Sequence, residues 1–423
     1  INPPMPMPMP GPPLPIDPLL PALIAALAGQ GQAVLQAPPG AGKTTRVPLA
    51  LLAGTRGRIV MLEPRRLAAR AAAERMAETL GESLGQSVGY RIRGEARVSA
   101  STRIEVVTEG ILTRMLQGDP GLEGIGAVIF DEFHERSLNA DLGLALVLEC
   151  RAALRPDLQV IVMSATLDAA PVAALMGGAP LLTAEGRAFP VETRWLDTPP
   201  ARDARLPQAV ADLTLQALAE TTGGVLVFLP GEGEIRRTAA LLAGRLPAEV
   251  QVHSLFGAMD FAAQRAVLAP QAQGRKLVLA TSIAETSLTI PDIRVVVDAG
   301  LARRARFDPN SGMSRLVTER ASLAEAGQRR GRAGRVAEGF CYRLWTRGQE
   351  GALPAFAPPE IETADLAGLA LDLALWGSAD LAFLTPPPPG PLAEARALLH
   401  DLGALEGGRI TTHGKAMAAL PLH

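Results

Sequence analysis

Ala127-Val-Ile-Phe-Asp-Glu132 is the most informative segment of this chain, because four consecutive apolar residues lead directly into two acids. A continuous apolar run of this kind is typical of a strand buried on both faces of a parallel sheet. Upstream lies Ala37-Pro-Pro-Gly-Ala-Gly-Lys-Thr-Thr45, which follows another apolar run at 33–37. A glycine loop ending in Lys-Thr offers N–H groups and an ammonium to phosphates, while strand-end acids can hold Mg²⁺ and activate water. The two stretches together predict nucleotide hydrolysis.

The glycine loop departs from the usual phosphate-loop pattern at its first position, where Ala37 replaces glycine. The later glycines let backbone N–H groups approach phosphate oxygens without interference from a Cβ. We expect Lys43 to bridge the β- and γ-phosphates and the Thr44 hydroxyl to bind Mg²⁺. The alternative is a plain glycine turn with an incidental lysine, which the downstream acid pair makes negligible. The residues expected to bind the nucleotide through this loop are Gly40, Gly42, Lys43, Thr44 and Thr45.

The acid pair lies within Asp131-Glu-Phe-His-Glu-Arg136. Asp131, at the strand end, is expected to hold Mg²⁺ through water, and Glu132 is the candidate base that orients and deprotonates the attacking water. An isolated Asp-Glu pair is more often the solvated start of a helix. The apolar run before it and the phosphate loop favour the catalytic interpretation. His134 alone would be interpreted as structural.

The rest of the chain alternates strands with helices in two series, which predicts an α/β fold with two parallel-sheet domains in tandem. The second series has no Lys-Thr phosphate loop, so the nucleotide loop belongs to the first domain. Expected strands are 33–37, 58–63, 104–108, 127–132, 159–166, 224–230, 249–255, 276–282 and 294–298. Expected helices are 65–80, 110–117, 141–154, 232–243 and 260–268.

The 423 residues divide into four expected segments. Proline density marks the boundaries, with a hinge expected over 184–205. The segments are a proline-rich disordered tail (1–15), the first sheet domain (16–185), the second sheet domain (186–352) and a small, mostly helical domain, truncated at its end (353–423).

Composition sets limits on function. Hydrophobic residues make up 48% and charged residues 20% of the chain, as in a soluble globular protein. The net charge of −2 shows no global basic signal, so nucleic-acid binding must come from local arginine clusters. Cys150 and Cys341 match no metal or redox spacing, which fits the reducing cytoplasm. The apolar stretch 19–28 is shorter than the ~20 residues a bilayer requires, so no membrane is expected.

Six further signatures follow in order: Glu63-Pro-Arg-Arg66, Thr108-Glu-Gly110, Ser164-Ala-Thr166, Phe228-Leu-Pro-Gly231, Ala280-Thr-Ser-Ile-Ala-Glu-Thr-Ser-Leu-Thr289 and Gln328-Arg-Arg-Gly-Arg-Ala-Gly-Arg335. With the loop and the acid pair, this ordered set resembles the DEAH-box branch of the superfamily 2 helicases, and within it the bacterial HrpB-type proteins. Phe133 stands where that box has alanine. The resemblance runs from about residue 19 to the end.

The resemblance implies two RecA-like domains with ATP between them, followed by a winged-helix-like domain. It implies that Gln328 positions water or the γ-phosphate and that Arg332 and Arg335 are arginine fingers. A guanidinium delivered on closure is worth about 10³- to 10⁵-fold in related phosphoryl transfers. The alternative is a solvated basic helix or phosphate-backbone contacts, which applies more strongly to Arg329 and Arg330.

The resemblance also implies coupling and strand-binding positions. Ser164 and Thr166, with His134, would relay the nucleotide state, although the two hydroxyls could equally cap the next helix. Backbone contacts of this kind position a strand without reading its sequence. The expected nucleic-acid contacts are Arg65, Arg66, Thr108 and Thr281.

Base recognition is expected to be loose. Arg75 aligns with an arginine that stacks on adenine, but Leu301 stands where relatives carry the opposing phenylalanine. Nucleoside triphosphates other than ATP are therefore also expected to be substrates for hydrolysis.

Residues 305–318 predict a β-hairpin around Asn310-Ser311-Gly312. The resemblance implies that it helps to part a duplex; a plain extension of the sheet is the alternative.

The sequence thus predicts a cytoplasmic ATP-dependent nucleic-acid helicase or translocase that uses Mg²⁺ and moves 3′ to 5′ along a single or partly duplex strand, with RNA favoured. No protein partner is indicated. The alternatives are a DNA translocase or remodeller without strand separation, and a nucleic-acid-binding module whose NTPase has decayed.

Overall fold

The structure is a computed structural model that describes residues 11–165, 169–186, 189–201, 204–271, 273–285, 290–308, 311–378 and 380–420. It forms two compact units. The first unit comprises Ile1–Glu185, Arg306–Arg315 and Pro358–His423, and the second comprises Gly186–Ala305 and Leu316–Ala357. Thr166 and residues 1–10 of the expected tail lie outside the described residues.

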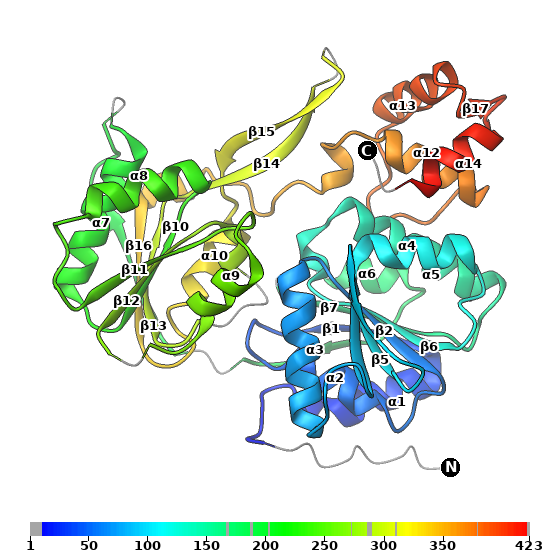
Figure 1. Cartoon of the computed structure of the whole chain (residues 1–423), viewed down its shortest axis with the longest axis horizontal. Helices are drawn as coiled ribbons and strands as arrows, with labels where there is room; N and C mark the ends of the chain where they lie inside the picture. The colour runs from blue at the N-terminus through cyan, green and yellow to red at the C-terminus, as the bar shows by residue number, and fades with distance from the viewer. Residues whose placement is uncertain are drawn as a thin grey trace. The chain divides into compact units, whose positions relative to one another are not determined.

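The first unit is built on a sheet whose described strands run in the order β4-β3-β5-β2-β6-β7-β1-β8, and Figure 1 labels β1, β2, β5, β6 and β7 of this sheet. The neighbours pair in parallel except for β3 and β4, which are antiparallel. The strands are β1 Gln32–Gln36, β2 Arg58–Glu63, β3 Val88–Ile92, β4 Glu95–Arg97, β5 Ile104–Thr108, β6 Ile125–Phe130, β7 Gln159–Ser164 and β8 Leu181–Thr183.

Helices cover both faces of this sheet. Successive side chains of a strand point to opposite faces, and in these strands both faces carry apolar residues that pack into separate cores. Val60 and Val128 belong to one core, which includes side chains of α4, α5 and α6, while Ile59 and Ile129 belong to the other, with α1, α2 and α3. All six residues of β6 are buried, as the apolar run predicts. The helices are α1 Leu20–Gln30, α2 Lys43–Leu51, α3 Arg66–Leu80, α4 Glu109–Gly118, α5 Leu138–Ala153 and α6 Ala169–Leu175; η1 Asp17–Leu19 and η2 Phe133–Glu135 are 3₁₀ turns.

The second unit has a parallel sheet in the order β11-β12-β10-β13-β16-β9. One face packs against α7 and α8, and the other carries α9 and the end of α10. The strands are β9 Val191–Leu196, β10 Gly224–Phe228, β11 Val250–Leu255, β12 Arg275–Ala280, β13 Ile293–Asp298 and β16 Gly339–Thr346. The helices are α7 Leu206–Glu220, α8 Glu232–Leu242, α9 Phe261–Leu268, α10 Leu323–Gly331 and α11 Arg347–Glu350, with η3 Ser282–Ala284.

Two tandem parallel-sheet units confirm the predicted fold class, but the predicted hinge was too wide. Strand β9 lies inside the stretch 184–205 and pairs in parallel with β16, Arg194 opposite Tyr342. Proline clusters flank this strand without interrupting it, because the prolines at 190 and 199 fall just outside its ends.

The predicted hairpin is present. Strands β14 (Leu301–Asp308) and β15 (Met313–Arg320) form a separate two-stranded sheet, seen in Figure 1 as a long ribbon. Its described residues between Arg306 and Arg315 belong to the first unit, in which the Phe307 N–H donates to the Thr363 carbonyl at 3.0 Å.

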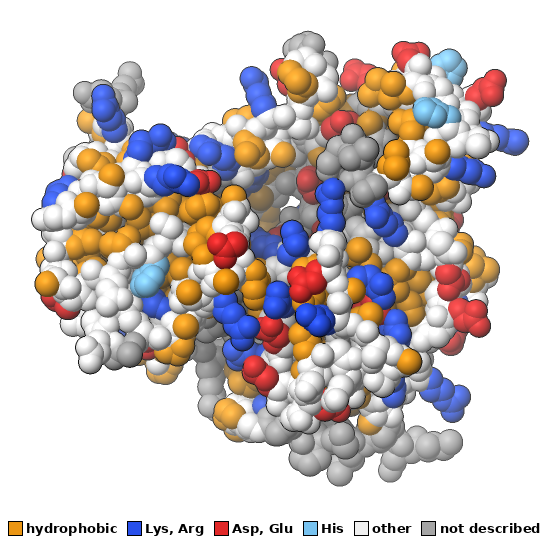
Figure 2. All heavy atoms as spheres, viewed as in Figure 1, with side chains coloured by type: hydrophobic (Ala, Val, Ile, Leu, Met, Phe, Trp, Pro, Cys, Tyr) orange, Lys and Arg blue, Asp and Glu red, His pale blue; other side chains and the backbone are white. Residues whose placement is uncertain are grey.

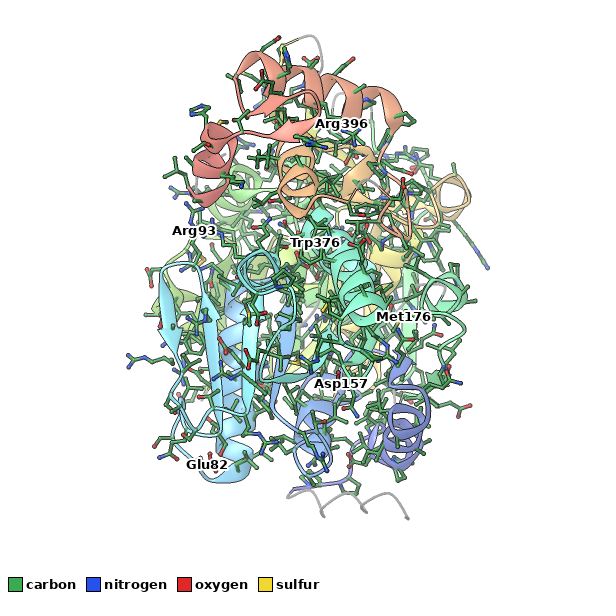
Figure 3. All side chains as sticks on the ribbon, turned by 90° about the vertical axis from the view of Figure 1, so that its right-hand side faces the viewer. Glu82, Arg93, Asp157, Met176, Trp376 and Arg396 are labelled. Carbon is green, nitrogen blue, oxygen red and sulfur yellow. The ribbon has the colours of Figure 1, made fainter. Side chains whose placement is uncertain are left out.

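The C-terminal region is helical with one small antiparallel sheet, and it belongs to the first unit. Its Leu369 and Leu373 share a core with Leu112 and Leu116 of α4. The indole of Trp376, which is labelled in Figure 3, donates to Glu149 of α5 and so links the C-terminal region to this helix. The elements are η4 Glu360–Glu362, α12 Ala367–Trp376, α13 Pro389–Asp401, β17 Leu405–Glu406, β18 Arg409–Ile410 and α14 Thr412–Ala419.

Candidate active site

The phosphate loop leaves β1 and enters α2, which begins at Lys43. Gly40 and Gly42 have φ of 87° and 94°, the left-handed region that favours glycine. Ala37, in place of the first glycine, has no positive φ; it is buried, and its N–H donates to the Ser164 carbonyl at 2.9 Å. The departure from the pattern therefore falls at a position whose backbone does not need glycine.

Lys43 is buried against the acid pair. Its Nζ donates to Glu132 Oε1 at 2.8 Å and lies 3.7 Å from Asp131 Oδ1. Burial alone would lower the pKa of Lys43, but the Glu132 and Asp131 carboxylates raise it above its usual range. The lysine therefore stays charged and available to an anionic phosphate.

Thr44 and Asp131 form the second contact between the loop and the acid pair. The Thr44 hydroxyl donates to Asp131 Oδ2 at 2.5 Å, and Asp131 Oδ1 accepts the Glu132 N–H at 2.8 Å. Two adjacent oxygen ligands fit a magnesium ion, which proteins usually bind through one or two carboxylates together with substrate phosphates. Within the described ranges, no cluster of three or more His, Cys, Asp or Glu side chains could hold a metal ion.

Glu132 has a strained backbone, with φ 49° and ψ 33°. A non-glycine residue in this region costs about 1–3 kcal/mol and is found where the surroundings impose it, often at functional sites. Its carboxylate lies between two partners, because Oε1 accepts from Lys43 and Oε2 is 3.4 Å from His134 Nε2.

His134 links the acid pair to the next signature. Its Nδ1 accepts the Ala165 N–H at 3.2 Å, so the proton of the neutral ring is on Nε2, which faces Glu132. Burial lowers the pKa of His134 and favours this neutral form. Ser164 is buried at the end of β7, one residue before Ala165.

Glu63 is a component of the site to which sequence reasoning assigned no role. It ends β2, and the Asp131 N–H donates to the Leu62 carbonyl at 3.0 Å, so Glu63 and Asp131 lie at the same level of adjacent strands. Glu63 is fully buried; burial, then Asp131 and Glu132, raise its pKa well above the usual value. An acid closing an apolar strand was the signal available in the sequence.

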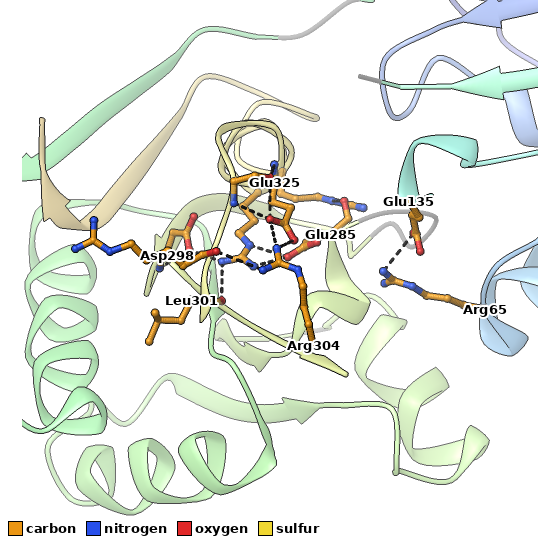
Figure 4. Close-up of polar contacts among 12 residues, drawn as sticks. Arg65, Glu135, Glu285, Asp298, Leu301, Arg304 and Glu325 are labelled. Carbon is orange, nitrogen blue, oxygen red and sulfur yellow. Dashed lines mark hydrogen bonds and ion pairs between the residues drawn. The ribbon is translucent and has the colours of Figure 1, made fainter. Parts of the chain in front are cut away.

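The positions expected to contact nucleic acid fall at element ends, whereas Arg75, expected to contact the base, lies inside α3. Arg65 pairs with Glu135, Nη2 to Oε1 at 3.2 Å (Figure 4), and Arg66 is the exposed first residue of α3. Thr108 precedes α4, and Thr281 precedes η3 in the second unit. Arg75 is exposed on α3. Both positive and negative side chains occur over each unit on the face drawn in Figure 2.

The arginine signature of the second unit, residues 328–335, begins in the last turn of α10 and continues past its end. The helix starts with a capping box between Ser322 and Glu325. Gln328 and Arg332 are buried, and the Arg332 Nε donates to the Glu285 carbonyl at 2.8 Å. Arg332 and Arg335 line one small cavity, together with Leu226, Ala284, Ile290 and Ile293.

Arg329 is neither solvated nor open to a phosphate backbone, so that part of the sequence interpretation was wrong. It is 1% exposed; Nη1 donates to Asp298 Oδ1 and Nε to Glu285 Oε1, both at 2.7 Å (Figure 4). Its guanidinium also lies 5.2 Å from the centre of the Phe228 ring. Arg330, by contrast, is exposed and donates to Val191 and Thr193. Arg329 thus links α10 to three other segments of the second unit: the ends of β10 and β13 and the turn that contains Glu285.

The predicted residues therefore gather in two groups, one in each unit. Two protein-family models match the chain: the DEAD/DEAH box helicase domain over residues 21–175 and the helicase conserved C-terminal domain over 206–337. The chain belongs to the DEAD/DEAH box helicases.

Within this class, the chain is similar to the ATP-dependent RNA helicase HrpB of Escherichia coli, with 49% identity over 413 residues, 96% of this chain and 51% of HrpB. The crystal structure of the Escherichia coli DEAH/RHA helicase HrpB matches with a TM-score of 0.91 over 96% of this chain and 52% of that one. The human ATP-dependent RNA helicase DHX33 is 34% identical over 97% of this chain and 61% of its own length. The chain thus spans about half the length of HrpB. These matches confirm the resemblance to the HrpB-type DEAH-box proteins.

A membrane-crossing helix, long and apolar enough to span a bilayer, is not found among the described residues.

Proposed function

We propose that this chain is the motor part of a cytoplasmic ATP-dependent RNA helicase, in which hydrolysis of Mg²⁺-ATP drives 3′ to 5′ movement along a single strand. The observation that carries the proposal is the buried group in which Lys43 and Thr44 of the phosphate loop contact Glu132 and Asp131 directly. The names and family of the relatives support RNA as the strand, ATP as the nucleotide and the helicase reaction.

Lys43 and Glu132 exchange partners in the proposed mechanism. The Lys43 ammonium donates to Glu132 Oε1 at 2.8 Å. A triphosphate bound by the loop competes for that ammonium, which releases Glu132 to accept a proton from the attacking water. Thr44 and Asp131 would hold Mg²⁺, which neutralises charge on the phosphates when it is bound.

The second unit supplies the remaining groups. Gln328 orients the water or the γ-phosphate, and Arg332 and Arg335 stabilise the charge that develops on the phosphoryl group. This division of labour agrees with the absence of a Lys-Thr loop from the second series of strands in the sequence.

The nucleotide site is coupled to the bound nucleic-acid strand through His134 and the segment that begins at Ser164. His134 Nε2 faces the Glu132 carboxylate, and His134 Nδ1 accepts the Ala165 N–H. A displacement of Glu132 is therefore passed through His134 to the signature that begins at Ser164. Arg65, Arg66, Thr108 and Thr281 contact the sugar-phosphate backbone, which makes binding sequence-independent and salt-sensitive. The β14–β15 hairpin parts the duplex.

We expect nucleotide choice to be loose, because the resemblance aligns Arg75 with an adenine-stacking arginine but Leu301 with the phenylalanine that opposes it in relatives. Hydrolysis rates with ATP, GTP, CTP and UTP test this; a strong preference for ATP would count against it.

The central experiment measures steady-state ATP hydrolysis with single-stranded RNA, single-stranded DNA or neither, for the wild type, Glu132→Gln and the exposed control Glu123→Gln. Loss of a general base lowers the rate by about 10²- to 10⁴-fold. We expect this loss in Glu132→Gln alone, with stimulation by RNA in the wild type. Unchanged hydrolysis in Glu132→Gln would reject the mechanism.

The same preparation separates the rival functions. Stimulation by DNA, with triplex displacement but no duplex unwinding, would identify a DNA translocase. Nucleic-acid binding without hydrolysis would identify a binding module.

A further inference from the structure

The chain just before α1 crosses the phosphate loop. Residues 11–19, here called the N-terminal strap, include the end of the proline-rich region and the η1 turn. Ile16 is fully buried in the same core as Ala41 of the loop and Val47 of α2. The strap is therefore part of the packing around the loop.

The strap contacts the loop itself at two points. The Ile16 N–H donates to the Ala41 carbonyl at 3.1 Å. Leu14 packs on Gly42 so closely that a Cβ at Gly42 would lie 2.6 Å from Leu14 Cδ1. Gly42 is the residue immediately before Lys43, so the strap rests on the backbone that sets the direction of the lysine.

Arg46 fastens the strap to the first turn of α2. Its side chain is buried, Nη2 donates to the Pro12 carbonyl at 3.0 Å, and Nε lies 3.5 Å from Asp17 Oδ1. Asp17 Oδ2 in turn accepts the Leu14 N–H at 2.8 Å. Asp17 thus holds both Arg46 and the residue that packs on Gly42.

This arrangement limits the conformational freedom of a glycine-rich loop. Glycines lose more conformational entropy on ordering than other residues, and Gly40 and Gly42 are both held in left-handed conformations. A loop that is ordered before the nucleotide arrives binds more tightly, because less entropy is lost on binding.

We propose that Leu14, Asp17 and Arg46 are positioning residues for nucleotide binding: the N-terminal strap pre-orders the phosphate loop. The proposal rests on the proposed function, in that the loop binds a nucleoside triphosphate. The contacts described above join the strap to the phosphate loop and to the first turn of α2, so we expect their contribution to fall on affinity and not on the hydrolytic step.

The test compares Leu14→Ala and Arg46→Met with a matched control, Arg155→Met. Arg155 also donates to backbone carbonyls, those of Gly121, Leu122 and the first residue of β6, Ile125, at the end of β6 opposite to Asp131. The readouts are the Kd for a fluorescent ADP analogue, KM and kcat for ATP, and hydrogen exchange of the loop amides.

Loss of one contact worth a buried hydrogen bond should raise Kd and KM about 5- to 10-fold in both strap variants, with kcat within about twofold. Amides of residues 40–44 should exchange faster. Arg46→Lys, which keeps the charge, should restore part of the affinity. In Arg155→Met, Kd should stay within about twofold of the wild type even if the thermal midpoint falls.

An unchanged Kd in both strap variants, or an equal rise in Arg155→Met, would overturn the proposal. Wild-type protein that binds the ADP analogue but does not hydrolyse ATP would instead overturn the proposed function. In that case the Kd of the strap variants still decides the positioning role.

Discussion

Replacing Arg329 by methionine should destabilise the second unit far more than replacing its neighbour Arg330. Methionine keeps part of the aliphatic volume but removes the guanidinium. Asp298, which is 0% exposed, and Glu285, which is 5% exposed, then lose the cation that they share. Breaking a buried ion pair by removing one partner costs about 3–5 kcal/mol, because the remaining charge stays buried.

The assay can be confined to the second unit. The chain has three tryptophans, and Trp195 and Trp345 belong to the second unit while Trp376 belongs to the first. In a Trp376→Phe background, intrinsic fluorescence therefore reports unfolding of the second unit during urea denaturation. With a slope of about 2 kcal/mol per molar urea, Arg329→Met should lower the midpoint by about 2 M.

Arg330→Met is the matched control. Its exposed guanidinium donates to the Val191 carbonyl and the Thr193 hydroxyl, so its loss should cost about 1 kcal/mol or less. A double-mutant cycle with Asp298→Asn should show that the two changes cost less together than their sum. If Arg329→Met shifted the midpoint no more than Arg330→Met, the buried network would not stabilise the unit and the reasoning would be refuted.

Two further predictions concern pH and backbone space. Burial raises the pKa of Glu109 from 4.5 to about 7, so the folded chain holds a proton that the unfolded chain releases; stability should fall by roughly 2–3 kcal/mol as pH rises from about 4.5 to 7 and then level off. Urea midpoints between pH 4.5 and 8, followed by Trp376 fluorescence in a background with Trp195→Phe and Trp345→Phe, should show a flatter profile in Glu109→Gln, and an identical profile would contradict this. A Cβ at Gly334 would lie 2.5 Å from the Phe189 carbonyl, whereas one at Gly331 would meet nothing within 4 Å. Gly334→Ala should therefore displace Arg335 and lower ATP hydrolysis at least tenfold while Gly331→Ala does not; equal rates in the two variants would exclude the steric argument.

Strands buried on both faces were predicted well. The expected limits of β2 agree with the structure to the residue, because a continuous apolar run with polar ends leaves little choice of boundary. The limits of β5 agree as well, although the buried Glu105 interrupts its apolar pattern. Strands β9 and β16 were missed. Arg343 interrupts the apolar pattern of β16, and its charge is balanced by Glu350 of α11, a pairing that only the folded chain provides.

Local features could be predicted from the residues alone: a glycine loop leading into Lys43, an acid pair at a strand end, and a hairpin. Each depends on residues adjacent along the chain. Which distant groups meet depends on the folded chain, since the register of β2 against β6 brings Glu63 beside Asp131. The folded chain also separates Arg329 from Arg330, because consecutive residues point about 100° apart around a helix, one into the core and one to solvent.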